Sequence, residues 1–256
     1  MNDNMYERNK YILFQNKNSW DLIADDWFGA TALPSYGVYC PDENQLNLLG
    51  DLKNKKILDI GCGSGHSLLW CKEQGAGVLW GVDLSSRQVS NAAKLLNNSG
   101  YSATLVNAPM EESEGIPIGY FDVVYSIYAI GWTTDIQKTF DNIYSYLKKD
   151  GIFVFSWDHP LINCIELEDN ALCFTGNYNA EETMTFEKGG NPVTLIKRKL
   201  STYINALAKA GFCVEKVIED VDTEKLKADR EQHSAYYSGV KAEHYPLSFI
   251  IKARKV

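Results

Sequence analysis

The chain has 256 residues, of which 45% are hydrophobic and 12% aromatic, so it holds enough apolar material for one large core. Its formal net charge is -8, from 33 acidic and 25 basic residues, which gives no broad attraction for a phosphate backbone, and we expect no nucleic-acid partner. We also expect no membrane partner and a cytoplasmic location, because residues 1–11 are polar and no later apolar run approaches membrane-spanning length.

The six cysteines are scattered along the chain and form no C-x-x-C pair. This spacing favours reduced, mostly buried thiols over a zinc site or a disulfide-exchange motif. We therefore expect no metal site.

Between residues 56 and 156, short apolar runs alternate with amphipathic segments, a pattern typical of βαβ units and a mostly parallel sheet. The near-continuous hydrophobicity of the runs predicts strands that are covered on both faces. Two further apolar runs follow towards the end of the chain. The seven predicted strands are Lys56–Ile60, Val78–Val82, Thr104–Val106, Phe121–Ser126, Gly151–Ser156, Phe212–Ile218 and Leu247–Lys252. We thus expect an α/β fold with a doubly wound, mostly parallel seven-stranded sheet.

Three amphipathic segments should form helices that cover this sheet. The first two follow Ser85 and Asp135, whose side chains can accept hydrogen bonds from the free N–H groups of a first helical turn. The third should begin after Ser201 as its cap and stop at Gly211.

Two stretches, residues 157–200 and 219–246, interrupt the alternation. The first has Gly189–Gly190–Asn191 between runs of β-branched and aromatic residues, which predicts a hairpin. The expected division is an N-terminal helical lead-in and lid (1–55), a ligand-binding core (56–156), a cap insertion (157–200), and a C-terminal part of the sheet (201–256) that carries the second insertion (219–246).

The segment from Lys56 to His66 reads KILDIGCGSGH, a strand that runs into a glycine-rich turn and then a helix. Glycines there let the backbone approach a ligand closely, and the helix N-terminus offers free N–H groups. Two acids add specificity, since Asp59 precedes the loop and Asp83 ends the next predicted strand, 22 residues after Gly61. A carboxylate at that strand end can accept hydrogen bonds from both hydroxyls of a ribose, which fits an adenosyl ligand as well as NAD.

The loop sequence ILDIGCGSG closely resembles the first motif of the class I S-adenosylmethionine-dependent methyltransferases, of the small-molecule, methyltransferase domain 11 or 25 kind. Its third glycine comes one residue earlier than in the dinucleotide-binding G-x-G-x-x-G. An N-terminal stretch and three later segments resemble the same family in the right order, namely residues 20–27, 107–111, 121–126 and 147–154. The resemblance implies a Rossmann-like methyltransferase fold with an antiparallel last strand, and S-adenosyl-L-methionine as the cofactor of the core.

Carried over position by position, the resemblance also implies which residues touch the cofactor. Gly61 and Gly63 would approach its methionine part, Asp83 would hold the ribose, and Asp59 would support the loop and the amino group of the ligand. Ala108 and Met110 would flank the adenine. The alternative role for Met110 is packing in the core, and the alternative for Asp83 is an ordinary acid at a strand end. The implied cofactor-binding set is Asp59, Gly61, Cys62, Gly63, Asp83, Leu84, Ala108, Pro109, Met110 and Ser126.

The sulfonium of such a cofactor already activates its methyl group, so in-line methyl transfer needs no metal and no nucleophilic side chain. A general base is needed only if the acceptor must lose a proton. His159 follows the fifth predicted strand, at the sheet edge where ligands bind, and is the candidate for that base. The alternative is a histidine that anchors its loop through hydrogen bonds.

Aromatic side chains should line the acceptor pocket, because their faces favour a sulfonium cation and suit a small organic substrate. Tyr36 and Tyr39 are expected to close over the cofactor, with core packing as the competing interpretation. Both insertions are expected to shape the pocket. The candidate pocket residues are Tyr36, Tyr39, Tyr128 and Trp157.

The predicted function is methyl transfer to a small-molecule acceptor. The fourth strand ends in YSIYAIG, whereas enzymes that methylate base or glutamine amide nitrogens resemble one another in an N/D-P-P-Y/F signature there. Two alternatives remain: a catalytically idle S-adenosylmethionine-binding sensor or scaffold and, against the glycine spacing, a nicotinamide-dependent oxidoreductase.

Overall fold

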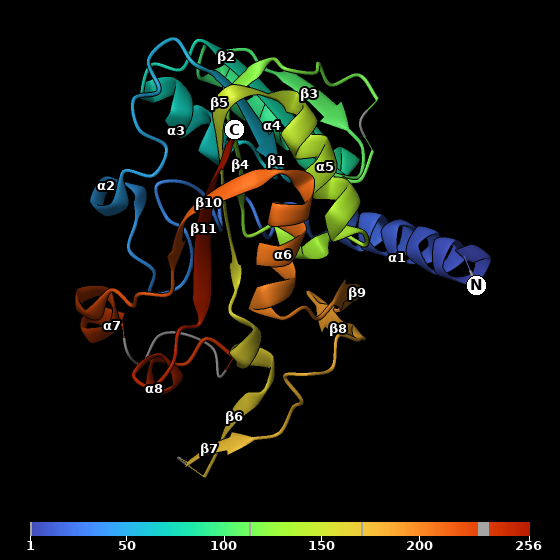
Figure 1. Ribbon diagram of the computed structural model, residues 1–256, viewed down its shortest axis with the longest axis vertical. Coiled ribbons are helices and arrows are strands. Elements are labelled where there is room, and N and C mark those ends of the chain that lie inside the picture. The colour runs from blue at the N-terminus through green and yellow to red at the C-terminus, as the bar shows by residue number, and fades with distance from the viewer. Residues whose placement is uncertain (1, 113, 170, 230–235) are drawn as a thin grey trace.

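The computed structural model describes residues 2–112, 114–169, 171–229 and 236–256. Its core is a seven-stranded sheet in the order β10-β11-β5-β4-β1-β2-β3 (Figure 1). The strands are β1 (Lys56–Ile60), β2 (Val78–Asp83), β3 (Thr104–Asn107), β4 (Phe121–Ile127), β5 (Leu147–Asp158), β10 (Phe212–Ile218) and β11 (Ser248–Lys255). The pairs from β3 to β5 are parallel, whereas β11 runs antiparallel to both β5 and β10. The predicted fold class, a doubly wound sheet with an antiparallel last strand, is confirmed.

All seven predicted strands are present, and β5 differs most in length. The prediction placed it at residues 151–156, whereas it begins at Leu147 and ends at Asp158. Both extensions find partners that are remote in sequence, because Leu147 pairs with Phe121 of β4 and Asp158 pairs with Ser248 of β11. The ends of this strand are therefore set by its neighbours and not by its own hydrophobic pattern.

Helices cover both faces of the sheet, as the hydrophobic runs predicted. Phe153 and Phe155 point to the face that carries α5 (Ile136–Tyr146) and α6 (Leu200–Ala210). Their neighbours Ile152 and Val154 point to the opposite face, which α3 (His66–Glu73) and the segment 33–52 cover. Helix α4 (Ser86–Asn98) packs beside α3 against β2 and β3. This two-sided packing makes the sheet a rigid platform for the loops at its carboxyl edge.

Two of the predicted helix caps and one predicted stop are confirmed. The side chains of Ser85 and Asp135 each accept an N–H from the first turn of the helix that follows. Gly211 ends α6 with a φ of 100°, a left-handed conformation that glycine adopts without steric cost.

The prediction of Ser201 as the cap of α6 is wrong, because the helix already begins at Leu200. Its N-cap residue Lys199 makes no side-chain capping bond. Instead Glu181 accepts the N–H of Lys199 at 2.9 Å and also the hydroxyl of Thr202. A carboxylate from the insertion thus fixes this helix start.

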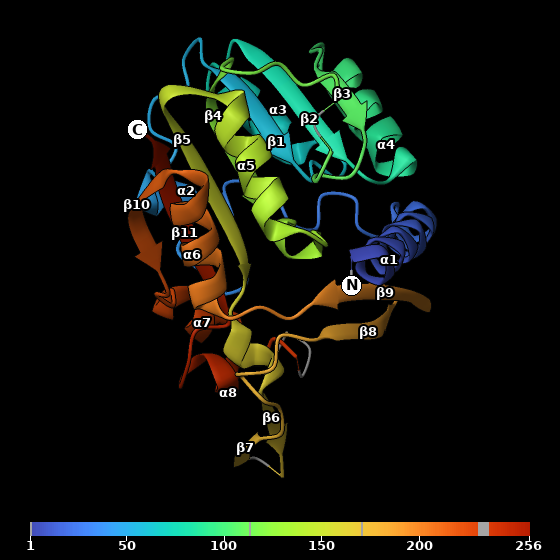
Figure 2. The same cartoon turned by 45° about the vertical axis from the view of Figure 1, so that its right-hand side comes forward.

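The insertion 157–200 folds into two hairpins, which are β6 (Ile165–Glu168) with β7 (Ala171–Phe174) and β8 (Thr183–Lys188) with β9 (Asn191–Ile196). The hairpin predicted at the glycine pair is confirmed, and Gly189 and Gly190 have φ values of 55° and 73°, as a type I′ turn requires. The β8–β9 hairpin lies against α1, whereas β6–β7 projects at the far end of the molecule (Figure 2).

Helix α1 (Asn2–Ile23) is held through its C-terminal half. Asn16 exchanges two hydrogen bonds with the backbone of Thr194 in β9, at 2.7 and 2.8 Å. On the other side Asp21 accepts a hydrogen bond from the hydroxyl of Ser85, the cap of α4, at 2.7 Å. The lead-in is thus fixed between the hairpin and α4, while its N-terminal half extends away from the body (Figure 1).

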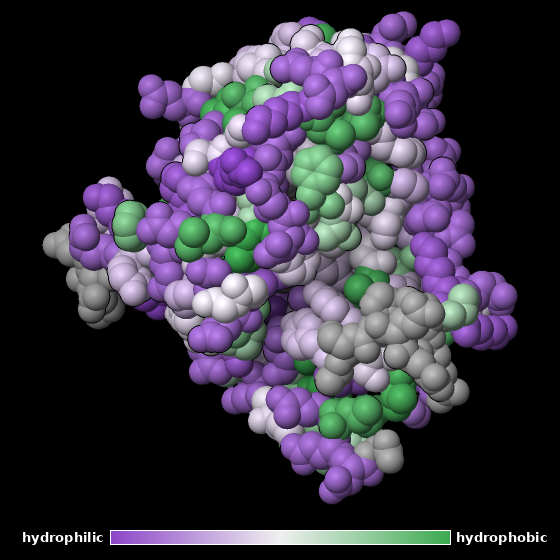
Figure 3. All heavy atoms as spheres, turned by 180° about the vertical axis from the view of Figure 1, so that it is seen from behind, coloured by the Kyte–Doolittle hydropathy of each residue, from purple (hydrophilic) through white to green (hydrophobic). Residues whose placement is uncertain are grey.

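The other elements are short: α2 (Glu43–Leu46), α7 (Thr223–Asp229), α8 (Gly239–Ala242) and the 3-10 turns η1 (Ile130–Trp132) and η2 (Pro160–Asn163). Helices α7 and α8 belong to the predicted insertion 219–246, of which residues 230–235 lie outside the described residues. No helix in the described ranges combines the length and apolar character needed to cross a membrane. The face seen from behind is mainly hydrophilic, with hydrophobic residues in separate small groups (Figure 3).

Candidate active site

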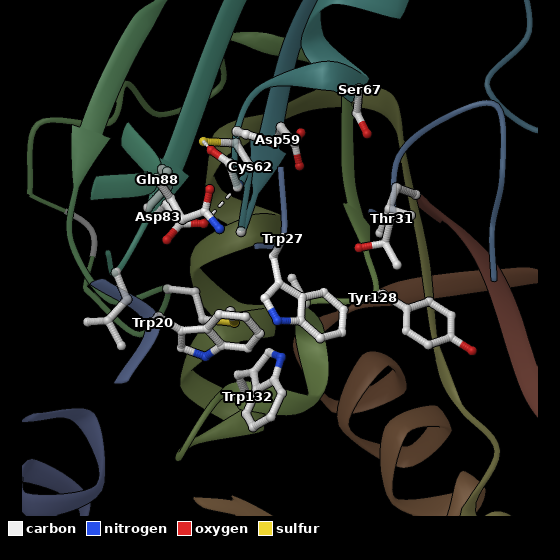
Figure 4. Close-up of a pocket in the computed structure, with 18 of the residues that line it drawn as sticks. Trp20, Trp27, Thr31, Asp59, Cys62, Ser67, Asp83, Gln88, Tyr128 and Trp132 are labelled. Atoms are coloured by element: carbon white, nitrogen blue, oxygen red, sulfur yellow. Dashed lines mark hydrogen bonds between the residues drawn. The ribbon is translucent and has the colours of Figure 1, made fainter. Parts of the chain in front are cut away.

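A pocket lies at the carboxyl ends of β1, β2 and β4 (Figure 4). Parallel strands bring these ends to one edge of the sheet, where the loops that follow them can surround a ligand. Five parts of the chain line it: α1 with its continuation to residue 31, the glycine loop, the end of β2 with the start of α4, the loop after β3, and the end of β4 with η1.

The glycine loop borders the pocket and is tied to β2. Gly61 and Cys62 donate their N–H groups to the carbonyl oxygen of Val82, at 2.8 and 2.9 Å. Gly61 has a φ of 78°, and a Cβ atom there would lie 2.2 Å from the Cβ of Ala129. Gly63 has a φ of 49°, but a Cβ atom there would meet nothing within 4 Å. Packing therefore requires the first glycine, whereas the second faces open space beside the loop.

Asp83 ends β2 with hydrogen bonds on both carboxylate oxygens. Oδ2 accepts the N–H of Gly63 and Oδ1 accepts the N–H of Ser85, each at 2.8 Å. Burial raises the pKa of Asp83 to about 6, because it disfavours the charged form, and the two N–H donors offset part of this effect. Asn107 fixes the same strand end, since its amide donates to the carbonyl oxygens of Asp83 and Leu84, both at 2.9 Å. The carboxylate is thus held in one orientation at the pocket.

The pocket has several acids and no matching basic side chain. Burial raises the pKa of Asp59 well above its ordinary value, and the nearby Asp83 carboxylate adds to the rise. Glu111 is the third acid, and within the described part of the chain no lysine or arginine is among the lining residues. Burial lowers the pKa of His66, which keeps its ring neutral at pH 7. Since buried carboxylates without a counter-charge are costly, the pocket suits a positively charged ligand.

Two buried acceptor atoms at the pocket have no partner among the described residues. They are Oε1 of Gln88 and Oε2 of Glu111. The other carboxylate oxygen of Glu111 accepts the hydroxyl of Thr133 at 2.8 Å and the N–H of Thr134. An unsatisfied buried acceptor costs about 1–3 kcal/mol, so a ligand with N–H or O–H donors would be stabilised here.

Aromatic rings form the side of the pocket that lies across from the acids (Figure 4). Trp20 belongs to α1, Trp27 follows it, and Trp132 belongs to η1. The ring of Trp20 meets those of Trp27 and Trp132 edge to face, with centroid distances of 6.0 and 5.3 Å. Tyr128 stands beside them with a left-handed φ of 51°. We call these four residues the aromatic wall, and such faces attract cations.

Comparison with known proteins agrees with this geometry. Residues 58–155 match the family model described as a methyltransferase domain. An S-adenosylmethionine-dependent methyltransferase from Mesorhizobium loti, solved as a crystal structure, is 25% identical with a TM-score of 0.68, over 82% of this chain and 94% of that one. Residues 58–155 thus form a methyltransferase domain of the class I S-adenosylmethionine-dependent kind. The Rossmann-like methyltransferase fold predicted from its motifs is confirmed.

Two relatives in the curated proteins extend the similarity of this methyltransferase beyond the core domain. An uncharacterized protein of Haemophilus influenzae is 29% identical over 223 residues, which are 82% of the methyltransferase and 85% of the relative. The tRNA U34 carboxymethyltransferase of Histophilus somni (strain 129Pt) is 28% identical over 192 residues, which are 74% of the methyltransferase and 54% of that protein. The methyltransferase thus spans about half the length of the second relative.

The residues of the pocket fit S-adenosylmethionine, the cofactor of this family. The cofactor carries a sulfonium and an ammonium, which match the uncompensated acids Asp59 and Asp83. Its ribose hydroxyls and adenine amino group are hydrogen-bond donors. The oxygens of Gln88 and Glu111 that have no partner among the described residues could accept hydrogen bonds from such groups. The open space beside Gly63 leaves room for the ligand next to the loop.

Nine of the ten residues predicted to bind the cofactor line the pocket, and their direct contact with it remains a prediction. The exception is Ser126, which is fully buried in the sheet. Its hydroxyl donates to the carbonyl oxygen of Ile60 at 2.7 Å and so links β4 to β1. The lining residues from the predicted set are Asp59, Gly61, Cys62, Gly63, Asp83, Leu84, Ala108, Pro109 and Met110.

The structure places Tyr36 and Tyr39 in the core and not at the pocket. Tyr36 is fully buried and donates its hydroxyl to Glu43 at 2.7 Å. Tyr39 packs in a separate cluster with Leu226 and Leu247. This corrects the expectation that they close over the cofactor, because Tyr36 packs into the sheet face that α3 covers and Tyr39 packs against residues from the end of the chain.

Of the other two predicted pocket residues, Tyr128 lines the pocket and Trp157 does not. The Trp157 ring lies so close to Gly131 that a Cβ there would be 1.8 Å from it, and it meets Trp132 edge to face at 5.6 Å. Trp157 therefore supports the aromatic wall from behind. The described residues of the two insertions are also absent from the pocket lining, because α1 closes the side where the cap was expected.

His159 lies just past β5, as predicted, but outside the pocket lining, and both of its ring nitrogens are engaged. Nδ1 accepts the N–H of Leu161 at 3.3 Å, and Nε2 lies 2.8 Å from Glu219. Burial lowers the pKa of His159, while its contact with Glu219 opposes this shift. The geometry favours the anchoring alternative over the role of a general base.

Replacing His159 by Ala is accordingly expected to lower the free energy of unfolding by about 1 kcal/mol, because the cap of η2 is lost, and to leave kcat nearly unchanged. Urea denaturation and steady-state kinetics measure the two effects. His159→Asn, which can still accept the Leu161 N–H, should recover most of the stability. A drop in kcat of about 100-fold or more in both variants would restore the general-base role.

The sequence assigned no role to several residues that line the pocket, among them Trp20, Trp27, Gln88, Glu111 and Trp132. Trp20, Trp27 and Glu111 had a signal, because residues 20–27 and 107–111 are among the segments that resemble the family. Gln88 has no local signal, since what marks it is a buried oxygen without a partner among the described residues.

Proposed function

We propose that this methyltransferase transfers the methyl group of S-adenosylmethionine to a small-molecule acceptor. The observation that carries the proposal is the aromatic wall, which faces the acid-lined half of the pocket. Two of its four residues come from α1 and its continuation, and two from the end of β4 and η1. A wall of large rings at that place leaves space for a modest organic molecule and excludes water from the reacting centre.

When bound, the cofactor supplies an activated methyl group for in-line displacement. The chain's own residues then have two tasks. The glycine loop with Asp59 and Asp83 holds the cationic ligand in one orientation. Trp20, Trp27 and Trp132 hold the acceptor against it and keep the site dry.

A tRNA acceptor is the competing proposal, since the Histophilus somni relative is named as a tRNA U34 carboxymethyltransferase. The charge of the methyltransferase favours the small molecule. Its net charge is -8, and the acids outnumber the bases, so its overall charge gives no broad attraction for a phosphate backbone.

The test is an incubation with S-adenosylmethionine labelled in its methyl group and two acceptor pools, total tRNA and a metabolite extract below about 1 kDa. We expect label in the metabolite pool and none in tRNA. Label in tRNA would overturn the small-molecule acceptor. Cofactor binding without label in either pool would show the idle, ligand-binding protein instead.

A further inference from the structure

One cation stands at the aromatic wall. Lys188, the last residue of β8, places its Nζ 3.8 Å from the ring centroid of Trp27, 5.2 Å from that of Trp20 and 5.7 Å from that of Trp132. All three rings line the pocket. Lys188 itself is not among the residues that line the pocket, but its ammonium lies against the rings that do.

The structure describes no anion beside the ammonium of Lys188. Among the described residues, no hydrogen-bond acceptor or carboxylate lies within bonding distance of its Nζ, and the contacts found there are with the three indole rings. The side chain is half-buried, and burial lowers the pKa of Lys188 to about 8, so it remains mostly charged at pH 7. Indole faces satisfy part of that charge, but no described residue accepts a hydrogen bond from its N–H groups.

The pocket is therefore polarised. Asp59 and Asp83 mark the half that suits the cationic cofactor, whereas Lys188 stands at the wall assigned to the acceptor. The acid that raises its pKa electrostatically is Asp158, which already accepts hydrogen bonds from Tyr236 and Tyr237, at 3.2 and 3.0 Å. A partly desolvated ammonium with free donors is best satisfied by an anion from the ligand.

Resting on the proposed function, we infer that the acceptor is an anionic small molecule, and that Lys188 binds its carboxylate or other oxyanion at the edge of the aromatic wall. A charge-assisted hydrogen bond of this kind fixes the acceptor in position without taking part in the methyl transfer. Lys188 is thus a positioning residue that selects for acidic acceptors. Neutral and cationic analogues of the same shape should be poor substrates, because they leave the ammonium unpaired.

The test separates the metabolite extract on an anion-exchange resin at pH 7 and offers the bound and unbound fractions to the enzyme with methyl-labelled cofactor. We expect the label in the bound, anionic fraction. With that fraction, Lys188→Met should raise the apparent KM by about 10- to 100-fold, the scale of a hydrogen bond to a charged group, with kcat largely kept. Lys188→Arg should retain most of the parent's KM. S-adenosylhomocysteine affinity, measured by calorimetry, should be the same in all variants.

Lys197→Met is the matched control, because Lys197 follows β9 and pairs with Glu182 at 2.8 Å outside the pocket lining. It should behave as the parent. Label in the unbound fraction, or an unchanged KM in Lys188→Met, would overturn the inference while leaving the proposed function intact. Loss of stability and of cofactor affinity in Lys188→Met, with KM unchanged, would assign the lysine a purely structural cation–π role. Label in neither fraction, with cofactor still bound, would refute the proposed function itself.

Discussion

Replacing Gly63 by Val should weaken the binding of S-adenosylmethionine by about 100-fold or more while the protein stays folded. A Cβ at this position meets no protein atom within 4 Å, so the added branched side chain enters open space beside the loop, which the cofactor needs. It also strains a φ of 49° at the residue whose N–H donates to Asp83. Calorimetric titration with S-adenosylhomocysteine and circular dichroism measure affinity and folding.

Gly100→Val is the matched control. Gly100 follows α4 with a φ of 76°, and a Cβ there also meets nothing within 4 Å, but it is exposed and outside the pocket lining. It carries a similar backbone strain and should bind the cofactor normally. Equal affinities in Gly63→Val and Gly100→Val would mean that the loop does not cradle the ligand.

Asp83→Ala is expected to weaken cofactor binding by about 1.5–3 kcal/mol, or roughly 10- to 150-fold, which is the scale of hydrogen bonds to a charged group. The reason is its fixed carboxylate at the end of β2, which is oriented by two N–H donors. Asp122→Ala is the control, since Asp122 lies near the start of β4 and pairs with Lys148 at 2.7 Å. That variant should lose some stability and no affinity. Equal affinity of Asp83→Ala and the parent would remove Asp83 from the binding site.

The same residue predicts a pH dependence. Burial raises the pKa of Asp83 to about 6 in the ligand-free protein, so below pH 6 its carboxyl is increasingly protonated and accepts ligand hydroxyls poorly. Cofactor affinity should fall as the pH drops from 7 to 5, and protonation of Asp59, whose pKa is also raised, acts in the same direction. Cofactor titrations of the parent and of Asp83→Asn across this pH range test the effect, and an equally steep loss of affinity in the Asn variant would contradict it.

The stability of the ligand-free protein should respond to Asp83 in the opposite sense. Because its pKa is raised in the folded state, Asp83 stabilises the folded protein at low pH, and this contribution is lost as the pH rises through about 6.

The sequence by itself determined the sheet and the residues of the acid-lined half of the pocket. Hydrophobic runs located all seven strands, and the spacing of Gly61, Gly63 and Asp83 marked the turn after β1 and the end of β2. These features are local, because a left-handed turn needs glycine at defined positions and a strand that is buried on both faces needs a continuous apolar run. The helix caps Ser85 and Asp135 were predictable for the same reason.

Only the tertiary structure decided what closes the pocket and what each candidate side chain contacts. Helix α1 lies against β9 through Asn16 and Thr194, which are 178 positions apart in the sequence, and this docking brings its tryptophans to the site in place of the expected cap. His159 and Lys188 show the same dependence. Glu219, 60 positions away, engages the histidine, and tertiary packing places the lysine among three indoles with no anion among the described residues. Hydrogen bonding, burial and charge compensation depend on which distant segments contact one another, and a local sequence pattern does not specify those contacts.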